Sequence, residues 1–451
     1  MYCDLTRGPI MRSLLLFALP MMAGNLLQQF YNVADTLVVG RVLGENALAA
    51  VGSAYTLMTF LTSVLLGLSM GAGAVFSIYW GRRDEASLRA AVYHAFWLVA
   101  VVAVVLTTLV YPGTDGILRF LRVPAEVYPG MREYVRIIFA GLAATALYNF
   151  FSCLLRAVGN SKAPLAFLAV SALLNVGLDI WFVAGLSWGI AGAALATVLA
   201  QYVSGIGILL YVLRRGRHLL PSRAERRFSP AMLGEIVRLS SLTCVQQSVM
   251  NFGILMVQGL VNSFGPTVMA AFAAAVKVDT FAYLPAQDFA NAYSTFVAQN
   301  FGAGQEERIR RGTRQSFALS LGFCAVISVL VFGLAGPLMG IFVQEGETAV
   351  VAAGVRYLRI EGACYCGIGC LFLLYSYYRA VKRAEMSVVL TAISLGTRVA
   401  LAYGLAATAL GETGIWLSIP IGWGLADLAG LWYMRRGRGL PGQRPKAEPA
   451  A

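Results

Sequence analysis

The chain has 451 residues, of which 58% are hydrophobic and 13% are charged, and its mean hydropathy is +0.70. Soluble domains carry about 25% charged residues, so this composition excludes a soluble protein. The long apolar runs predict an all-α membrane protein, because a membrane β-barrel would show short alternating segments instead. The net charge of +13 does not indicate a nucleic-acid partner, because the basic residues lie in short connections between apolar runs.

Twelve apolar runs follow one another along the chain, and each is long enough to span a bilayer. Pro112 and Gly113 are expected to end the third run, and the segment 159–164 to end the fourth. Pro20 is expected to bend the first helix or to start its regular part. The runs lie near residues 14–40, 47–80, 88–111, 133–155, 164–184, 189–213, 233–263, 267–299, 315–343, 355–378, 387–409 and 414–434.

The distribution of Lys and Arg predicts the orientation in the membrane. The two termini and the even-numbered connections hold 25 of these residues, and the odd-numbered connections hold 7. By the positive-inside rule, both termini of this plasma (inner) membrane protein are expected in the cytoplasm. The predicted parts are an N-terminal six-helix lobe (1–213), a cytoplasmic linker loop (214–232), a C-terminal six-helix lobe (233–434) and a disordered cytoplasmic tail (435–451).

The two halves repeat one another. One constant offset places Gly81 on Gly302 and Arg89 on Arg310, and a slightly longer offset places Arg156 on Arg379. Each half has an even number of spans, so the halves are expected to be parallel repeats. Such repeats are typical of transporters that bind substrate between two halves and alternate access, which favours a transporter over a channel or a receptor.

A polar stripe runs along the first apolar run. Asn25, Gln28, Asn32 and Asp35 follow helical spacing and share one face. A carboxylate within a membrane costs roughly 3 kcal/mol on insertion scales, so Asp35 must face a partner or a wet cavity. We interpret it as a group that titrates or binds a cation during transport. The alternative is a structural carboxylate satisfied by neighbouring amides.

Polar residues of the fifth and sixth runs extend this pattern. Asn175 and Asp179 are four residues apart and share a face, and Thr197 lies on the following run. Together with Asp35 they predict one oxygen-rich pocket in the N-terminal half. Hard oxygen ligands suit Na⁺, whereas two close carboxylates could share a proton, and both options stay open. The alternative is a polar network that only holds helices together.

The substrate cavity is the second site that we predict, and structural ion pairing is its alternative. Lys277 and Asp279 are two residues apart and cannot face each other on a helix, while Arg398 is expected to snorkel to the interface. No motif predicts a catalytic residue, a resident metal or a P-loop, so we expect neither an enzyme nor a cofactor other than the coupling ion. The predicted cavity residues are Gln28, Asn32, Tyr148, Asn149, Lys277, Asp279 and Asp288.

Five stretches, in this combination and order, resemble the multidrug and toxic compound extrusion (MATE) family. They are LPMMAGNLLQQFYNVADTLVVGRVLGENALAAVG (19–52), GLSMGAGAVFSIYWGRRD (67–84), LLRAVGNSKAP (154–164), NVGLDIWFV with GIAGAALATVLAQ (within 175–201) and AAAVKVDTFAYLPAQDFANAYSTFVAQNFGAG (273–304). The resemblance implies twelve helices in two lobes around a V-shaped cavity. It also implies export of amphipathic, often cationic compounds in exchange for Na⁺ or H⁺.

The resemblance also assigns residues. Asp35 looks like the family's first-helix carboxylate, and Asn175, Asp179 and Thr197 look like its N-lobe ion-site residues. The chain departs from one branch of the family, because the acids expected in the seventh and tenth helices of the C-lobe are missing. The seventh run has Gln246, Gln247 and Asn251 instead, and the tenth has only Glu361 at its start. An N-lobe ion site is therefore favoured over a C-lobe site.

These observations together predict a secondary active antiporter that exports cationic drugs or toxic compounds in exchange for Na⁺ or H⁺. We expect it to act as a monomer, with small-molecule substrates and membrane lipid as its partners. The alternative is a flippase for a lipid-linked oligosaccharide or another lipid-like cargo, which should have a more cationic cavity. The membrane segments contain two basic residues, Lys277 and Arg398, and more acidic ones, and this excess of negative charge favours cationic cargo. The four aspartates are Asp35, Asp179, Asp279 and Asp288.

Overall fold

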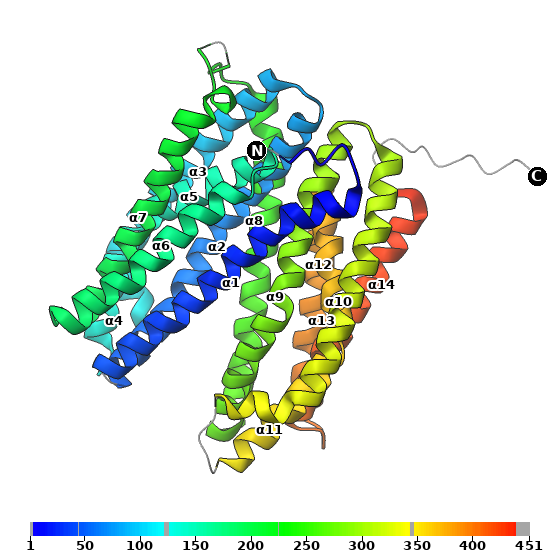
Figure 1. The fold of residues 1–451 in the computed structure, drawn as a ribbon. Helices are drawn as coiled ribbons and strands as arrows, with labels where there is room; N and C mark the ends of the chain where they lie inside the picture. The colour runs from blue at the N-terminus through cyan, green and yellow to red at the C-terminus, as the bar shows by residue number, and fades with distance from the viewer. Residues whose placement is uncertain (1–2, 44, 121–125, 224, 343–346, 439–451) are drawn as a thin grey trace, which may run out of the picture. The chain divides into compact units, whose positions relative to one another are not determined.

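The computed structural model describes residues 3–43, 45–120, 126–223, 225–342 and 347–438, which form helices joined by short turns (Figure 1). The expected tail lies outside these residues from 439 onward. The α-helices are α1 (Ile10–Leu43), α2 (Glu45–Gly81), α3 (Glu85–Phe120), α4 (Tyr128–Phe139), α5 (Leu142–Ala157), α6 (Lys162–Asp179), α7 (Gly189–Arg215), α8 (Pro230–Asn262), α9 (Pro266–Gly302), α10 (Glu306–Gly340), α11 (Thr348–Gly362), α12 (Tyr365–Ala380), α13 (Ala384–Ala406) and α14 (Glu412–Tyr433), and the shorter segments are η1 (Ile180–Gly185), η2 (Arg217–Leu219) and η3 (Met434–Arg438).

The described helices confirm the predicted fold class. Ten of them are long and apolar enough to cross a membrane. Two further spans arise when the bent pairs α4–α5 and α11–α12 are each counted as one span. The total then reaches the twelve spans that the apolar runs predict.

The chain divides into two compact units. The N-terminal unit contains residues 1–4 and 19–244, and the C-terminal unit contains residues 5–18 and 245–451. The division therefore falls inside α1 and inside α8, whereas the sequence places it at the linker 214–232. The linker and the first half of α8 both belong to the N-terminal unit.

Two pairs of turns show that the internal repeat extends to backbone conformation. Arg83 and Gly304, which the first offset pairs, have φ angles of +59° and +69°. Gly159 and Lys382, which the longer offset pairs, have φ angles of +87° and +61°. A left-handed residue other than glycine costs roughly 1–2 kcal/mol, so the repeat keeps this geometry even where Arg83 and Lys382 make it unfavourable.

The expected end of the third span is wrong, because α3 continues through Pro112 to Phe120. Pro20 does not start the regular part of the first helix, because α1 begins ten residues before it, and a bend at Pro20 stays a prediction. A proline removes one main-chain hydrogen bond, but membrane helices tolerate this because neighbouring groups satisfy the freed backbone.

The fourth and tenth spans, predicted as single helices, are broken. The axes of α4 and α5 differ by 46°, and those of α11 and α12 by 52°. Gly141 lies at the first break, where an added Cβ would be 2.1 Å from Oε1 of Gln201 on α7. A side chain at this position would require the flexible end of Gln201 to move.

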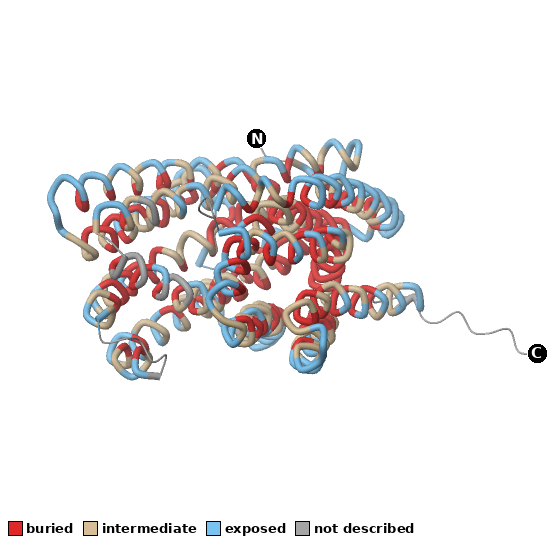
Figure 2. The backbone as a smooth tube through the Cα atoms, turned by 90° about the horizontal axis from the view of Figure 1, so that it is seen from below, coloured by how far each residue is buried: buried red, intermediate tan, exposed pale blue. Residues whose placement is uncertain are grey.

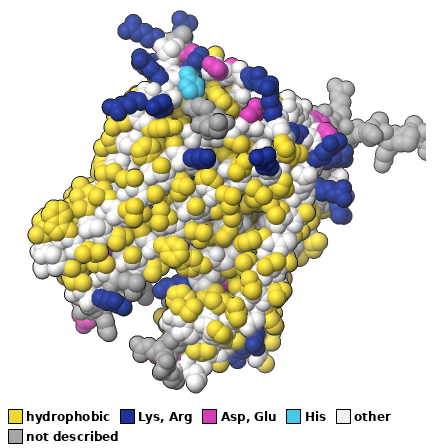
Figure 3. All heavy atoms as spheres, viewed as in Figure 1, with side chains coloured by type: hydrophobic (Ala, Val, Ile, Leu, Met, Phe, Trp, Pro, Cys, Tyr) yellow, Lys and Arg dark blue, Asp and Glu magenta, His cyan; other side chains and the backbone are white. Residues whose placement is uncertain are grey.

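In each unit, apolar residues lie both in the packed interior and on the outer surface, as they do in membrane proteins. In Figure 2, buried and exposed stretches alternate along most helices, so that a helix has one packed face and one outer face. On α3, Trp97, Val101 and Val104 are exposed at helical spacing. Hydrophobic side chains cover much of the face in Figure 3. Such a surface fits contact with lipid tails rather than with water.

Two glycines of α2 allow close contact with α8 inside the N-terminal unit. A Cβ added at Gly67 would lie 2.6 Å from Cα of Cys244, and one at Gly71 would lie 2.5 Å from Cα of Ser240. The hydroxyl of Ser240 donates to the carbonyl of Leu68 at 3.0 Å. Small residues four apart that let backbones approach are a recurrent contact between membrane helices.

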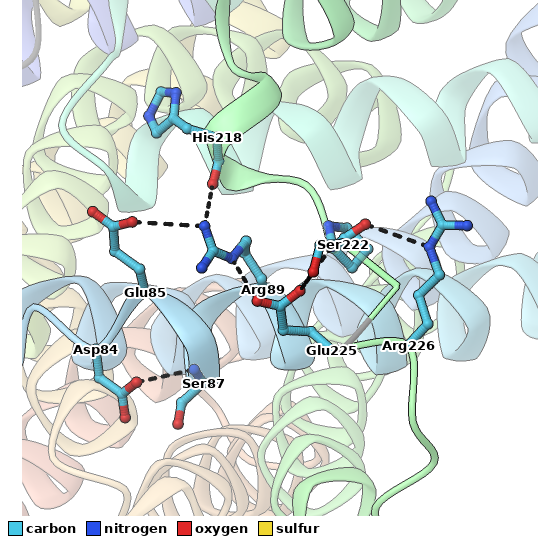
Figure 4. Close-up of polar contacts among 9 residues, drawn as sticks. Asp84, Glu85, Ser87, Arg89, His218, Ser222, Glu225 and Arg226 are labelled. Carbon is cyan, nitrogen blue, oxygen red and sulfur yellow. Dashed lines mark hydrogen bonds and ion pairs between the residues drawn. The ribbon is translucent and has the colours of Figure 1, made fainter.

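The linker between the halves is bound to α3 (Figure 4). Nε of Arg89 lies 3.1 Å from Oε1 of Glu225, and Nη1 of Arg89 donates to the carbonyl of His218 at 3.4 Å. The backbone N–H of Ser222 donates to Oε2 of Glu225 at 2.8 Å, and the hydroxyl of Ser222 donates to the same oxygen. Glu225 therefore fixes the linker to the start of α3.

This contact predicts a pH dependence. The hydrogen bonds from Ser222 lower the pKa of the Glu225 carboxyl group below its ordinary value of 4.5, because they favour the charged form. A carboxyl group with a lowered folded-state pKa stabilises the protein above its unfolded-state pKa, and this stabilisation is lost as the pH falls through the folded value. We expect Glu225→Gln to reduce hydrogen-exchange protection of residues 217–223 at neutral pH. The difference from wild type should disappear as the pH falls through that window.

Glu85→Gln is the matched control, because Glu85 also lies beside Arg89, at 3.6 Å, but is on α3 itself. Equal loosening of the linker by both variants would contradict a specific role for Glu225.

Candidate functional site

Five polar side chains of the N-terminal unit come from four helices. Asp35 lies on α1, eight residues before its end, and Tyr134 lies on α4. Asn175 and Asp179 lie at the end of α6, and Thr197 lies on α7. The four predicted ion-site residues are thus on three helices of one unit, and Tyr134 joins them from a fourth.

The structure brings these side chains together. The carboxyl groups of Asp35 and Asp179 interact directly. The hydroxyl of Tyr134 interacts with Thr197 and lies within reach of the charges on both carboxyl groups. Nδ2 of Asn175 donates to the hydroxyl of Thr197 at 3.3 Å, and that hydroxyl donates to the carbonyl of Ala193 at 3.1 Å.

The site is buried and rich in unpaired oxygen atoms. Asp179 is 0% exposed and Asn175 is 2% exposed. Both carboxylate oxygens of Asp179, Oδ1 of Asp35 and Oδ1 of Asn175 have no hydrogen-bond partner among the described residues. Buried polar atoms without partners are costly. A proton or a small hard cation bound by these oxygens would remove that cost.

The backbone changes at this site. α6 ends at Asp179, and the π-helical segment η1 begins at the next residue. Such π-helical turns occur frequently at functional sites. Phe182 of η1 stacks on Trp188, with 4.8 Å between ring centroids, and so holds the connection to α7. No periodicity in the sequence predicts this segment.

The predicted cavity residues of the N-terminal unit lie on two helices. On α1, Gln28 is exposed and Asn32 is partly buried. Tyr148 and Asn149 are partly buried on α5. The hydroxyl of Tyr148 donates to the carbonyl of Pro164, in the first turn of α6, at 3.1 Å. Tyr148 therefore has a contact that holds two helices together.

The predicted cavity residues of the C-terminal unit all lie on α9. Lys277 is exposed, and its Nζ lies 5.9 Å from the ring centroid of Phe342. Asp279 and Asp288 are buried, at 2% and 1% exposure. Lys277 is therefore exposed while the two carboxylates are buried. This agrees with the expectation that Lys277 and Asp279 lie on different faces of the helix.

A second polar cluster lies in the C-terminal unit. The hydroxyl of Tyr365 on α12 donates to Oδ1 of Asp279 on α9. Glu361 and Tyr357, both on α11, lie beside Asp279, and Arg398 on α13 acts on both carboxyl groups. Arg398 is half-buried, and its charge acts on both acids. Its position at the membrane interface stays a prediction.

Sequence reasoning missed Tyr134 and most of the second cluster. The missed residues are aromatic, or they lie at a helix end or on a helix without a polar stripe. A shared position in the internal repeat is the signal that could have found them.

A comparison with protein families supports the internal repeat directly. The MatE family model matches the chain twice, at residues 20–181 and at residues 243–404.

The chain belongs to the MATE family. This MATE transporter is 30% identical, over 435 residues, to the probable multidrug resistance protein YpnP of Bacillus subtilis, and the alignment covers 96% of this chain and 97% of YpnP. It is 28% identical, over 345 residues, to the probable multidrug resistance protein NorM of Thermotoga maritima, with 75% of this chain and 73% of NorM covered. The protein is therefore a multi-pass membrane protein of a multidrug efflux transporter family, and not an enzyme.

Solved structures show the same fold. A multidrug resistance MATE family transporter in an outward-facing conformation matches with a TM-score of 0.91 and 23% identity, over 97% of this chain and 98% of that one. A transporter from Pyrococcus furiosus, described as having a binding pocket of reverse polarity, matches with a TM-score of 0.90 and 23% identity, over 96% and 97% of the two chains. At this identity, the likeness concerns the fold alone.

Proposed function

We propose that this MATE transporter is a secondary active antiporter that exports amphipathic, cationic compounds in exchange for H⁺ or Na⁺ by alternating access. The observation that carries the proposal is the buried pair of Asp35 and Asp179, whose carboxyl groups interact directly. Asn175 and Thr197 complete an oxygen-rich site around this pair.

Charge explains why this pair would couple to an ion. Two unit charges 4 Å apart repel by about 4 kcal/mol at an effective dielectric constant of 20. No Lys or Arg is among the groups that act on Asp35 or Asp179 in the part of the chain that the structure describes. The pair is therefore expected to take up one proton or one hard cation from outside. If the two conformations of the transporter bind this ion with different affinities, the ion gradient can drive the conformational change that exports the substrate.

The membrane placement and the cargo are part of the proposal. The excess of 25 Lys and Arg residues over 7 supports a plasma (inner) membrane location with both termini in the cytoplasm. The membrane aspartates outnumber the membrane cations in the sequence, which supports cationic cargo. Action as a monomer is also part of the proposal, because the four ion-site residues lie in one unit of the chain.

The test is transport by the purified wild-type protein in liposomes. Efflux of ethidium is followed by fluorescence while a Na⁺ gradient and a pH gradient are imposed separately. We expect one gradient to drive efflux, and that gradient identifies the coupling ion. If neither gradient moves ethidium, export of organic cations is wrong, and a lipid-linked cargo becomes the function to test.

A further inference from the structure

A charged hollow lies where the last turns of α3 meet the first turns of α4, in the N-terminal unit. Figure 1 shows α4 at the end of this unit that is opposite to the linker. The hollow has a volume of about 830 Å³, within the range of roughly 300–1,000 Å³ that is usual for small-ligand sites. Its charged residues are Asp115, Arg119, Arg132, Glu133 and Arg136, so it carries one net positive charge.

Asp115 on α3 holds two arginines of α4 in place. Nε and Nη2 of Arg132 donate to its two carboxylate oxygens at 2.5 and 3.0 Å, and Nη2 of Arg136 lies 3.5 Å from Oδ2. The hydroxyl of Tyr128 donates to Oδ1 at 3.0 Å. One carboxylate therefore serves two guanidinium groups, which leaves positive charge for a second anion.

Two arginines of the hollow have donors that no acceptor uses. Nε of Arg136 is buried and has no hydrogen-bond partner among the described residues. Arg119, in the last turn of α3, is exposed and forms no ion pair with the part of the chain that the structure describes. A guanidinium presents its N–H groups in a planar fork that matches the oxygens of carboxylate and phosphate groups. Arg119 and Arg136 therefore favour an anion with several oxygens.

The exposed face of α3 leads into this hollow. Val101, Val104 and Tyr111 are exposed on one side of the helix, and Asp115 and Arg119 continue the same helical spacing. At 1.5 Å per residue, Val101 lies about 15 Å from Tyr111 along the axis, which is half of a hydrocarbon core of about 30 Å. Tyrosine is enriched at the membrane–water interface. The apolar part of this stripe therefore has the length of one lipid acyl chain, and the arginines lie at the level of the headgroups.

The internal repeat keeps one part of this arrangement. Cζ of Arg136 lies 6.0 Å from the ring centroid of Tyr111, and Cζ of Arg359 lies 5.5 Å from that of Phe332. The first offset pairs the two aromatic residues, and the longer offset pairs the two arginines. Both units therefore place an arginine over an aromatic ring at corresponding positions.

The second open arginine is particular to the N-terminal unit. The first offset places Gly340 at the position of Arg119. Arg356, which precedes Arg359 on α11, forms an ion pair with Glu412 of α14. Arg359 therefore has no arginine in the place of Arg119, and the C-terminal unit provides a matched reference for the hollow.

We propose that the hollow between α3 and α4 binds the phosphate of one anionic phospholipid, whose acyl chains lie along the exposed stripe of α3. Arg119 and Arg136 donate to the phosphate oxygens, while Asp115 holds Arg136 in place. A phosphodiester with an uncharged headgroup, as in phosphatidylglycerol, carries the one negative charge that balances the hollow. The lipid lies in the leaflet opposite to the linker. This site is separate from the candidate ion site and goes beyond the proposed function.

The test compares lipid binding at two matched positions. Leu109→Trp places a fluorescent reporter beside the hollow, and Leu330→Trp places one at the repeat-related position of the C-terminal unit. Both leucines are exposed, at 66% and 48%. Each full-length variant is reconstituted in phosphatidylcholine liposomes that contain a small fraction of brominated phosphatidylglycerol. Bromine quenches tryptophan on contact, and the reporter signal is the difference from the wild-type protein.

We expect phosphatidylglycerol to associate about fivefold more strongly beside Leu109→Trp than beside Leu330→Trp, the factor that one additional arginine near a membrane surface contributes. Brominated phosphatidylcholine should quench both reporters equally, because it adds a positive charge beside the arginines. Equal quenching of the two reporters by brominated phosphatidylglycerol would overturn the proposal.

Arg119→Gln is the deciding variant, because Arg119 is exposed and its replacement should leave the fold intact. It should lower the association of phosphatidylglycerol beside Leu109→Trp to the level beside Leu330→Trp. Arg359→Gln is the matched control and should leave the quenching of Leu109→Trp unchanged. An undiminished preference for phosphatidylglycerol in Arg119→Gln would contradict the assignment.

Inorganic phosphate distinguishes a lipid from a free anion. At constant ionic strength it should leave the quenching of Leu109→Trp unchanged, because it lacks the acyl chains that hold the lipid on α3. If inorganic phosphate abolishes the quenching, the hollow is a site for a free anion, and the lipid assignment is wrong.

Discussion

Asp35→Asn and Asp179→Asn are each expected to reduce gradient-driven ethidium efflux to the level of protein-free liposomes. Either change removes one of the two charges that make the pair take up an ion, and a neutral amide cannot replace it. The folded protein should remain intact. A membrane carboxylate costs roughly 3 kcal/mol on insertion scales, so its replacement should leave the melting temperature unchanged or raise it.

Asp115→Asn is the control for this prediction. Asp115 lies in the same unit, but its carboxyl group forms an ion pair with Arg132 near the end of α3 and is 34% exposed. An exposed pair of this kind contributes little to stability, so efflux should be close to wild type. If Asp35→Asn exports ethidium as well as wild type does, the carboxylate is structural and the ion-site assignment fails.

Gly71→Ala is expected to destabilise the N-terminal unit, and Gly71→Leu to prevent its correct packing. The new Cβ would meet Cα of Ser240 at 2.5 Å and the carbonyl of Leu239 at 2.8 Å, and both are backbone atoms that cannot turn away. The helices α2 and α8 must then separate, which weakens the bond from Ser240 to Leu68. Overpacking of this kind typically costs about 1–3 kcal/mol, so the melting temperature in detergent should fall.

Gly234→Ala is the matched control on the partner helix. Nothing in the described part of the chain lies within 4 Å of a Cβ added at Gly234. Alanine favours a helix over glycine by about 1 kcal/mol, so this variant should melt at the wild-type temperature or slightly above it. A Gly71→Ala protein that melts like Gly234→Ala would show that α2 and α8 do not need their close approach.

The fold class could be predicted because the bilayer imposes it. Twelve apolar runs, an excess of basic residues on one side and an internal repeat leave few other architectures. The internal geometry could not be predicted in the same way. The sequence predicts a helix end at Pro112, because it does not show which neighbouring groups satisfy the main-chain carbonyl that a proline leaves without a donor. The contact between Gly141 and Gln201 could not be predicted either, because the two residues are distant in sequence.

The candidate site could be predicted only in part, for a related reason. Asp35, Asn175 and Asp179 are polar groups in apolar helices, and such residues are visible without a structure. Tyr134 is not, because a buried tyrosine in an apolar helix resembles any core residue. Glu361 lies near the start of a predicted run, where charges are usually exposed. Only the packing of α9, α11 and α13 brings it together with Asp279 and Arg398.

The sharing of α1 between the two units has a consequence for the order of synthesis. Residues 5–18 leave the ribosome before residues 245–451, yet the two segments form one unit. The carbonyls of Leu5 and Gly8 accept hydrogen bonds from Arg308, and that of Leu5 also accepts one from Asn300. Residues 5–18 must therefore wait for α9 and α10 before their main-chain groups are satisfied. A halved gene cut at the linker would separate this segment from its binding residues, so the two fragments would have to meet in the membrane before either is complete.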